Sequence, residues 1–149
     1  MTRRSGGCAC GAIRYQVDGE PLVCFICHCT DCQRATGGGP AYDLLFPVEA
    51  FALLKGEPRV HWTTAQSGKR VGRYFCGECG TPVFGDIESL PHARDIPVGS
   101  LDDPGIFSPT LHMWVKSAPP WHHIDPDLRQ FEGNPREGRH LSARSESDR

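Results

Sequence analysis

Eight cysteines, gathered in three short segments, constrain this 149-residue chain more strongly than any other feature of its sequence. They occupy positions 8, 10, 24, 27, 29, 32, 76 and 79. No apolar stretch of the kind that marks a secretory signal precedes Cys8, so a disulfide-rich secreted scaffold is not expected. In a reducing cytoplasm, closely spaced thiols stay reduced and usually bind a metal ion. The cysteine pattern therefore predicts a cytoplasmic metal-binding protein.

Two glycine-flanked cysteine pairs predict a closed zinc centre. Cys76 and Cys79 form a CxxC pair followed by Gly80, which is the shape of a zinc knuckle. Cys8 and Cys10 form a second pair, and the two pairs together would complete a tetrahedral shell of four sulfurs. We interpret this closed centre as structural, because it would join the N-terminal strand to a distant hairpin. A thioredoxin-like redox pair is the alternative for the CxxC segment, but no βαβ pattern surrounds it.

The denser second group of cysteines predicts a different kind of metal site. Its candidate ligands are Cys27, Cys29 and Cys32. Three protein thiolates leave the fourth position of a zinc ion open, which is typical of a catalytic or substrate-binding site. Cys24 as a fourth ligand would close the site, but it lies in the apolar segment 22–26, where cysteine often serves as a small buried hydrophobe. We expect His28, between two ligands, to be exposed or to lie beside the site rather than to bind the ion.

Glycine and proline, with 17 and 13 residues, favour a turn-rich, mainly β fold of antiparallel sheets over long helices. Short apolar or alternating segments, separated by turn signals, predict the strands. These segments span residues 12–17, 41–46, 51–54, 59–63, 70–75, 82–85, 95–98 and 110–115. One short helix is predicted at 30–36, after the second cysteine group, with Thr30 as its N-cap and Gly37 at its end. A turn is predicted near 48–51.

A single zinc-binding domain is predicted for residues 1–131. From Glu132 onward the chain has almost no apolar residues, so residues 132–149 are expected to form a disordered tail. The net charge of −2 and the dispersed Lys and Arg residues argue against nucleic acid or a membrane surface as a partner. No segment approaches the roughly 20 apolar residues of a membrane span. The exposed strand edges of such a sheet favour a homodimer.

Three segments give the chain a resemblance to a known family. They are Gly7–Tyr15 (GCACGAIRY), Cys27–Gly37 (CHCTDCQRATG) and Phe75–Pro82 (FCGECGTP). The chain resembles the glutathione-dependent formaldehyde-activating enzyme family, which also contains centromere protein V. Residues 99–104 and 112–117 resemble later segments of that family, so the resemblance extends from about Gly6 to Trp121.

This resemblance implies a β-tent of antiparallel sheets that is pinned by zinc. The structural zinc would fall on Cys8, Cys10, Cys76 and Cys79, and the second, catalytic zinc on Cys27, Cys29 and Cys32. Cys24 matches no metal position of the family. The implied reaction is the condensation of formaldehyde with glutathione to S-(hydroxymethyl)glutathione, which is formally a carbon–sulfur lyase reaction run backward.

We therefore expect a zinc-dependent enzyme of the carbon–sulfur lyase type, because a thiol that enters an open zinc position loses its proton and becomes a nucleophile. Glutathione carries two carboxylates, and Arg34 is the first candidate to bind them because it is close to the second cysteine group. Arg14, Lys69 and Arg73 are weaker candidates. The alternative is a non-catalytic zinc module that binds a protein or a small thiol. Chromatin association, as in centromere protein V, is a third hypothesis, but the chain has no basic region to support it.

Several aromatic and histidine residues near the C-terminal end are also candidates for packing or a pocket. His112 and Trp114 alternate on the predicted strand 110–115 and so share one face of it. We expect a core histidine and a core tryptophan at these positions rather than the walls of a pocket. Trp121, after two prolines, is expected to pack and close the domain, and the pair 122–123 (His-His) is expected at the surface.

Overall fold

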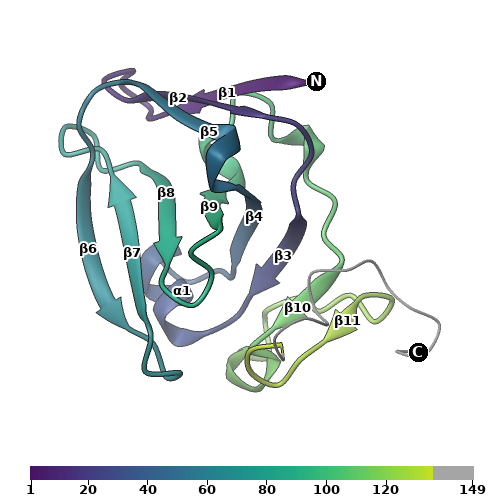
Figure 1. The fold of residues 1–149 in the computed structure, drawn as a ribbon. Coiled ribbons are helices and arrows are strands. Elements are labelled where there is room, and N and C mark those ends of the chain that lie inside the picture. Colours follow the sequence, from purple (N-terminus) through teal and green to yellow (C-terminus); the bar gives the residue numbers. More distant parts are fainter. Residues whose placement is uncertain (136–149) are drawn as a thin grey trace. The chain divides into compact units, whose positions relative to one another are not determined.

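The chain folds into a mainly β protein with one short α-helix, as its turn-rich sequence predicts (Figure 1). The computed structural model describes residues 1–135. Most of the tail predicted at 132–149 lies outside the described residues, but Asn134 is in contact with Trp114, whose indole N–H donates to Asn134 Oδ1 at 2.7 Å. Within residues 1–135, no helix is both long and apolar enough to cross a membrane.

Short strands make up most of the regular structure. The strands are β1 (Arg3–Gly7), β2 (Arg14–Asp18), β3 (Val23–Cys27), β4 (Ala41–Pro47), β5 (Phe51–Lys55), β6 (Arg59–Thr64), β7 (Arg70–Phe75), β8 (Pro82–Ile87), β9 (Ala93–Pro97), β10 (Leu111–Met113) and β11 (Arg129–Gln130). The helix is α1 (Thr30–Thr36), and short 3₁₀ helices span Val48–Ala50, Val98–Ser100, Pro104–Ile106 and Val115–Ser117. The predicted helix at 30–36 is confirmed, and the predicted turn near 48–51 is the first 3₁₀ helix.

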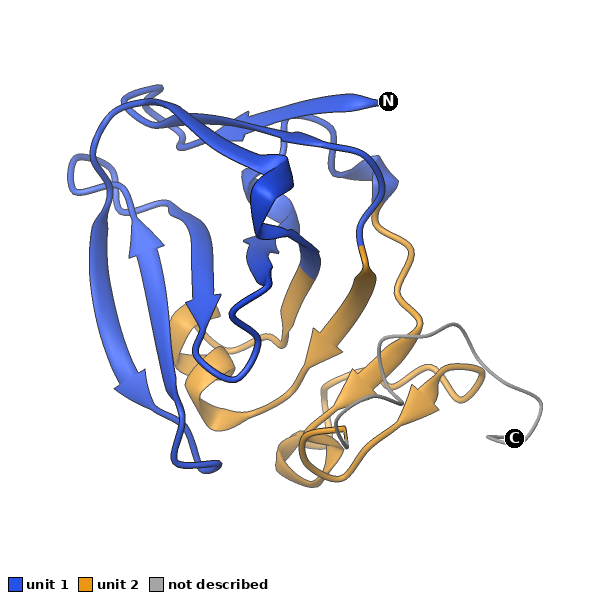
Figure 2. Ribbon diagram, in the orientation of Figure 1, with its two compact units in different colours: residues 1–21, 44–106 blue, residues 22–43, 107–149 orange. Residues whose placement is uncertain are grey.

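The chain divides into two compact units, each assembled from two separate stretches of sequence (Figure 2). Unit 1 comprises residues 1–21 and 44–106. Unit 2 comprises residues 22–43 and 107–149, of which those up to 135 are described. Because neither unit is continuous in sequence, each depends on contacts between residues that are far apart in the chain. The assignment of residues 1–131 to a single zinc-binding domain remains a prediction.

Unit 1 is built from antiparallel strands. Strand β2 pairs with β1 and with β5, and the consecutive strands β6, β7, β8 and β9 pair with one another in order. The turn after β1 carries Cys8 and Cys10, and the turn after β7 carries Cys76 and Cys79. Two of these cysteines are part of a buried hydrophobic cluster, whose members are Cys8, Ile13, Cys76, Val83 and Phe84. The cysteine-bearing turns of unit 1 are therefore continuous with its core.

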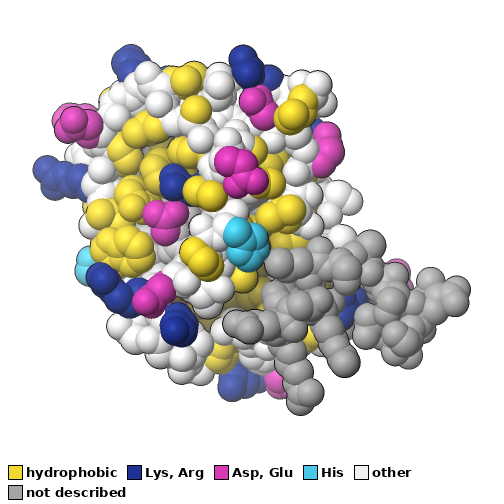
Figure 3. Space-filling view, in the orientation of Figure 1, with side chains coloured by type: hydrophobic (Ala, Val, Ile, Leu, Met, Phe, Trp, Pro, Cys, Tyr) yellow, Lys and Arg dark blue, Asp and Glu magenta, His cyan; other side chains and the backbone are white. Residues whose placement is uncertain are grey.

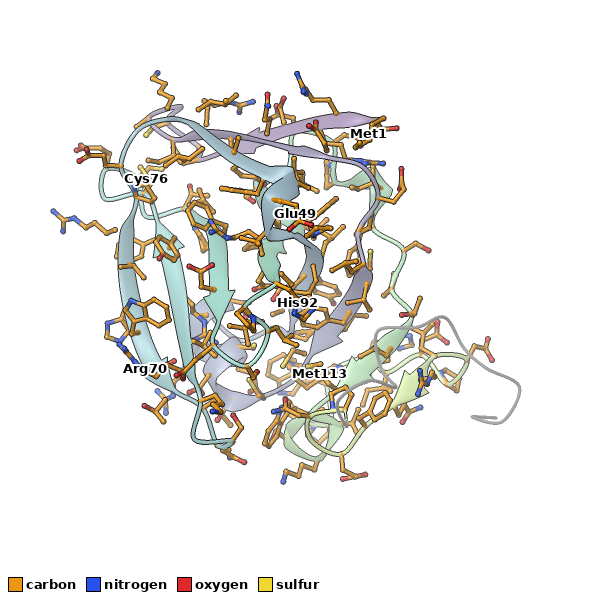
Figure 4. All side chains as sticks on the ribbon, viewed as in Figure 1. Met1, Glu49, Arg70, Cys76, His92 and Met113 are labelled. Atoms are coloured by element: carbon orange, nitrogen blue, oxygen red, sulfur yellow. The ribbon has the colours of Figure 1, made fainter. Side chains whose placement is uncertain are left out.

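Unit 2 contains a parallel pairing of strands that the sequence does not predict. Strand β10 pairs in parallel with β3, which sets Leu111 opposite Phe25 and Met113 opposite Cys27, and it also pairs in parallel with β11. All five residues of β3 are buried, as is typical of a strand covered on both faces. Figure 4 labels Met113 at the end of β10, where its carbonyl oxygen accepts the N–H of His28 at 3.0 Å.

The bounds of β7 are confirmed at 70–75, and most other predicted strands differ from the observed ones by one or two residues at an end. Strands β1, β3 and β11 are absent from the prediction. Strand β1 has the sequence RRSGG, which lacks any apolar alternation, and β3 is a uniformly apolar run with no period of its own. The predicted strand 110–115 is too long, because Trp114 takes a left-handed backbone conformation (φ 58°) and ends β10 at Met113.

The absence of a side chain at Gly6 allows β1 to approach a buried tyrosine. Gly6 lies opposite Tyr15 in the β1–β2 pairing, and Tyr15 is completely buried. The Tyr15 hydroxyl lies 2.7 Å from the Ser100 hydroxyl, which in turn donates to the Val83 carbonyl oxygen at 3.1 Å. A Cβ atom at Gly6 would overlap the Tyr15 ring and the carbonyl oxygen of Ser100. Both obstacles are held in place by hydrogen bonds or by the backbone, so neither can move aside easily.

We predict that Gly6→Ala lowers the free energy of unfolding by about 1–3 kcal/mol, the usual cost of forcing extra atoms into a packed core. Urea unfolding followed by circular dichroism measures this difference. Gly99→Ala is the matched control, since no atom lies within 4 Å of the position its methyl group would occupy. Equal stability of the two variants would contradict the close approach of β1 to Tyr15.

Candidate metal centres

The four cysteines of unit 1 converge, although 66 positions separate Cys10 from Cys76. The Sγ atoms of Cys8, Cys10, Cys76 and Cys79 all lie within 4.8 Å of one another, and we call this group the first cluster. The Sγ atoms of Cys8 and Cys10 are 3.6 Å apart, and those of Cys10 and Cys76 are 3.8 Å apart. A tetrahedral zinc ion with Zn–S bonds of about 2.3 Å requires sulfur–sulfur distances of about 3.8 Å. The donor atoms of the first cluster therefore fit a four-sulfur zinc centre.

Hydrogen bonds from the surrounding turns stabilise the sulfurs of the first cluster. The N–H of Ile13 donates to Cys8 Sγ at 3.2 Å, and the N–H of Glu78 donates to Cys76 Sγ at 3.4 Å. The side-chain hydroxyl of Thr81, 3.1 Å from Cys79 Sγ, and then backbone N–H groups lower the pKa of Cys79 to about 5. Figure 4 labels the neighbouring Cys76. The donors around Cys79 favour its thiolate, which is the form of cysteine that binds metal.

The second cluster consists of Cys27, Cys29 and Cys32, whose Sγ atoms lie within 4.8 Å of one another. Cys27 ends β3, Cys29 is the N-cap of α1, and Cys32 lies in the first turn of that helix. The Cys29 sulfur accepts the N–H of Cys32 at 3.3 Å, and so it replaces the side-chain oxygen of an ordinary cap. The predicted N-cap, Thr30, is therefore wrong by one residue. The cap therefore brings the first turn of the helix, with Cys32, next to the Cys29 sulfur.

The three thiols of the second cluster are too close together to ionise independently. The pKa of Cys27 is raised, chiefly by its hydrogen bond with the Cys29 thiol. The pKa of Cys32 is also raised, first by its hydrogen bond with the Cys27 thiol and then by that with the Cys29 thiol. Adjacent negative charges disfavour one another, and a cation between them would offset this repulsion. Soft thiolate donors suit zinc, so this donor set fits a zinc ion with three protein sulfurs.

Neither Cys24 nor His28 belongs to the second cluster within the described part of the chain. Cys24 precedes Cys27 by three positions on β3, and residues at such a spacing point to opposite faces of a strand. It is buried, as predicted for a small hydrophobe. His28 has an exposed fraction of 0%, which excludes the exposed position, so a place beside the cluster stays the prediction for this residue.

Three buried histidines form a chain of hydrogen bonds beside the second cluster, and we call them the histidine chain. Their exposed fractions are 0% for His28, 1% for His112 and 8% for His122. His28 Nε2 lies 2.8 Å from His112 Nδ1, and His28 Nδ1 lies 2.9 Å from His122 Nδ1. At one end the N–H of Asp125 donates to His112 Nε2 at 3.1 Å. At the other end His122 Nε2 lies 2.8 Å from the carbonyl oxygen of Gly38.

The two ends of the histidine chain determine where its protons lie. A backbone N–H can only donate, so His112 accepts at Nε2 and must donate from Nδ1 to His28. His28 then accepts at Nε2 and donates from Nδ1 to His122, which donates from Nε2 to a carbonyl oxygen that can only accept. All three rings are therefore neutral in this arrangement. Burial, and then the charges of the two neighbouring imidazoles, lower the pKa of His28 to about 4, and burial lowers the pKa of His112.

The sequence predicts the histidine chain only in part. His112 is confirmed as a core histidine, and the exposed position of His123 is also confirmed. His122, expected at the surface, is buried instead, because its ring packs against His28 with centroids 5.1 Å apart. The parallel register of β10 on β3, which brings residues 28 and 112 together, has no local signature in the sequence.

The candidate arginines differ in what they contact. Arg34 is exposed in the last turn of α1, two residues after Cys32. In unit 1, Arg14 forms an ion pair with Asp102, and Arg73 donates to the Thr63 hydroxyl at 3.1 Å. On the face shown in Figure 3, the Lys and Arg side chains of the described residues lie singly among hydrophobic and acidic side chains.

The two tryptophans of unit 2 do not take the places predicted for them. Trp114 lies beyond the end of β10 and is only half-buried, so it is not a core residue on the strand face of His112. The backbone N–H of Trp114 donates to the carbonyl oxygen of Gly133 at 3.2 Å. Trp121 is 69% exposed and does not close the domain as a packing anchor, although its ring meets His122 edge-on with centroids 4.6 Å apart.

Fold and clusters together define a mainly β protein with two thiol-rich sites that can hold a metal ion, one with four sulfurs and one with three. The sequence profile of glutathione-dependent formaldehyde-activating enzymes matches residues 3–117, and the chain belongs to this family. A Halomonas elongata protein provisionally named glutathione-dependent formaldehyde-activating enzyme is 26% identical over 140 residues, which cover 89% of this chain and 88% of that protein. A crystal structure of a Rhodobacter sphaeroides protein shares the fold with a TM-score of 0.55 at 17% identity, covering 85% of this chain and 98% of that one.

We predict that the three buried histidines each show a single neutral tautomer near pH 7, because each ring nitrogen has a fixed partner. The protons are expected on Nδ1 of His28, Nδ1 of His112 and Nε2 of His122. Long-range ¹H–¹⁵N correlation spectra of the imidazole rings measure this directly, with the exposed His123 as the internal control. A proton on Nε2 of His28, or a protonated ring, would contradict the hydrogen-bond chain.

Proposed function

We propose that this protein is a zinc-dependent enzyme of the carbon–sulfur lyase type, which acts on the adduct of a thiol and an aldehyde. The substrate pair that the family name suggests is glutathione and formaldehyde. In the direction of condensation, the glutathione sulfur bonds to the formaldehyde carbon, and the thiol proton passes to the former carbonyl oxygen. The product is S-(hydroxymethyl)glutathione, and no oxidant or reductant is needed.

The unequal size of the two cysteine clusters carries this proposal. Cys8, Cys10, Cys76 and Cys79 would fill all four positions of a structural zinc ion. Cys27, Cys29 and Cys32 would hold a second, catalytic ion and leave one position for a thiol. When bound there, zinc supplies the positive charge that removes the proton of an incoming thiol. Two zinc ions per chain, one structural and one catalytic, are therefore proposed.

We propose that a small thiol reaches the second cluster from the side of α1. Cys27 is buried, whereas Cys29, the N-cap of α1, is half-buried, so the start of the helix is the accessible part of this cluster. We propose the exposed guanidinium of Arg34 as a group that binds a glutathione carboxylate, because charge-assisted hydrogen bonds to arginine suit such a group. Arg14 belongs to unit 1 and its guanidinium is already paired with Asp102, so we do not propose it for this role.

The cellular setting of the enzyme follows from the same chemistry. A reducing cytoplasm supplies glutathione and keeps the cysteines of both clusters reduced, so we propose a cytoplasmic location.

The alternative function is a non-catalytic zinc module that binds a small thiol or a protein. Both functions predict two bound zinc ions; turnover separates them, and a fourth protein ligand on the second ion would favour the non-catalytic module. A homodimer through exposed strand edges, and the absence of nucleic acid and membrane partners, remain predictions.

We predict that the zinc-loaded protein accelerates the interconversion of formaldehyde, glutathione and their adduct above the uncatalysed rate, as measured by exchange NMR. Cys27→Ala should lower this acceleration by at least about 100-fold, since even the loss of a group that supports a metal ligand costs 10- to 100-fold. Cys24→Ala is the matched control, because Cys24 lies on the same strand with the same 5% exposure and should leave the acceleration unchanged.

The outcome separates the two candidate functions. A protein that holds both zinc ions and yet leaves the exchange at the uncatalysed rate would contradict the enzymatic proposal and favour the non-catalytic module. An equal loss in Cys24→Ala and Cys27→Ala would contradict the assignment of the second cluster.

A further inference from the structure

Every polar group of His28, in the backbone and in the ring, forms a hydrogen bond. Its N–H donates to the Met113 carbonyl oxygen at 3.0 Å, and its carbonyl oxygen accepts from Gln33 Nε2 at 2.8 Å. Its two ring nitrogens are bonded to His112 and His122. His28 lies between Cys27 and Cys29 in the sequence. Its four hydrogen bonds therefore restrain the backbone segment that carries two of the three candidate ligands.

The same hydrogen bonds connect the second cluster to three other parts of unit 2. His112 belongs to β10, so the bond between His28 and His112 links the end of β3 to that strand. His122 bonds to Gly38, which follows the left-handed C-cap of α1. Gln33, in the middle of α1, donates to the carbonyl oxygens of both His28 and Ser117. The middle of the short helix and the residue after its C-cap are thereby bonded to the buried residues His28 and His122.

We propose that His112 and His122 are positioning residues for the second cluster, which act through His28 to hold Cys27, Cys29 and Cys32 in the geometry that binds the metal ion. This inference rests on the proposed zinc ion at those three cysteines. A short helix that buries none of its residues has little packing of its own to hold it in place. Buried hydrogen bonds with single partners supply the rigidity instead, and they engage both ring nitrogens of His28.

A merely structural role for the histidines predicts a different pattern of effects. If the three rings only filled the core, apolar side chains of similar volume would do so without the cost of burying polar groups. If the rings only filled the core, the zinc affinity would also not depend on which ring nitrogen of His112 or His122 is retained. A positioning role depends instead on the one nitrogen that faces His28, which is Nδ1 in both residues.

Asparagine and glutamine substitutions distinguish the contributions of the two nitrogens of each ring. Asparagine places its amide near the position of Nδ1, so His112→Asn and His122→Asn retain a partner for His28. Glutamine places its amide near Nε2, so His112→Gln and His122→Gln retain the partner of Asp125 or Gly38 and lose that of His28. All four variants introduce the same polar group, and His123→Ala is the control at an exposed histidine beside the chain.

The experiment measures zinc affinity at each centre of the full chain by competition with a chromophoric chelator. In NMR spectra of the cadmium-113-substituted protein, the resonance that wild type shows and Cys27→Ala lacks is assigned to the second centre. We expect the glutamine variants to bind the second ion about 10- to 100-fold more weakly than wild type, the usual effect of losing a group that orients a ligand. The asparagine variants and His123→Ala should retain most of the affinity, and the first ion should be unaffected in all five.

A second measurement needs no variant of the histidines. Because coupling is reciprocal, metal at the second cluster should slow the solvent exchange of the ring N–H protons of the histidine chain relative to Cys27→Ala. Equal affinities in the asparagine and glutamine variants, equal loss at both centres, or unchanged ring exchange would overturn the positioning role while the proposed enzyme stands. A wild-type chain that binds only one ion, at the first cluster, would overturn both.

Discussion

The convergence of thiol groups from turns far apart in the sequence is the interaction on which unit 1 depends. Cys8 and Cys76 are buried with Ile13 and Val83, so the sulfurs and the hydrophobic side chains of this unit form one core. Sulfur–sulfur distances of 3.6 and 3.8 Å match the edges of a tetrahedral zinc site. With zinc bound there as proposed, the free energy of metal binding would contribute to folding directly.

Unit 2 uses the same ligand chemistry in a different way. Its three sulfurs come from the end of a strand, the cap of a helix and the first turn of that helix, rather than from two facing turns. This cluster has three sulfurs instead of four, and we propose that the buried histidine chain holds His28 between two of them. A closed site suits stability, whereas an open site suits a substrate. With zinc bound as proposed, the two clusters would divide those tasks between them.

The sequence predicts the local parts of this design well and the long-range parts poorly. Cysteine spacing is a local property, and the helix at 30–36 is bounded by a capping segment and by Gly37, which takes the left-handed conformation (φ 87°) at its C-cap. Strand β1 has no apolar alternation, and it is defined only by its pairing with β2. The burial of His122 depends on its contact with His28, a residue 94 positions away, and such a long-range contact leaves no local sequence pattern.

The central claim is that the second cluster holds a zinc ion with three protein sulfurs and one replaceable ligand. A crystal structure of the zinc-loaded protein, with anomalous data at the zinc edge before and after a glutathione soak, measures this most directly. We expect two anomalous peaks, with Cys27, Cys29 and Cys32 around the second and a glutathione sulfur in its fourth position after the soak. A second peak closed by a fourth protein ligand, or a single peak at the first cluster alone, would contradict the account.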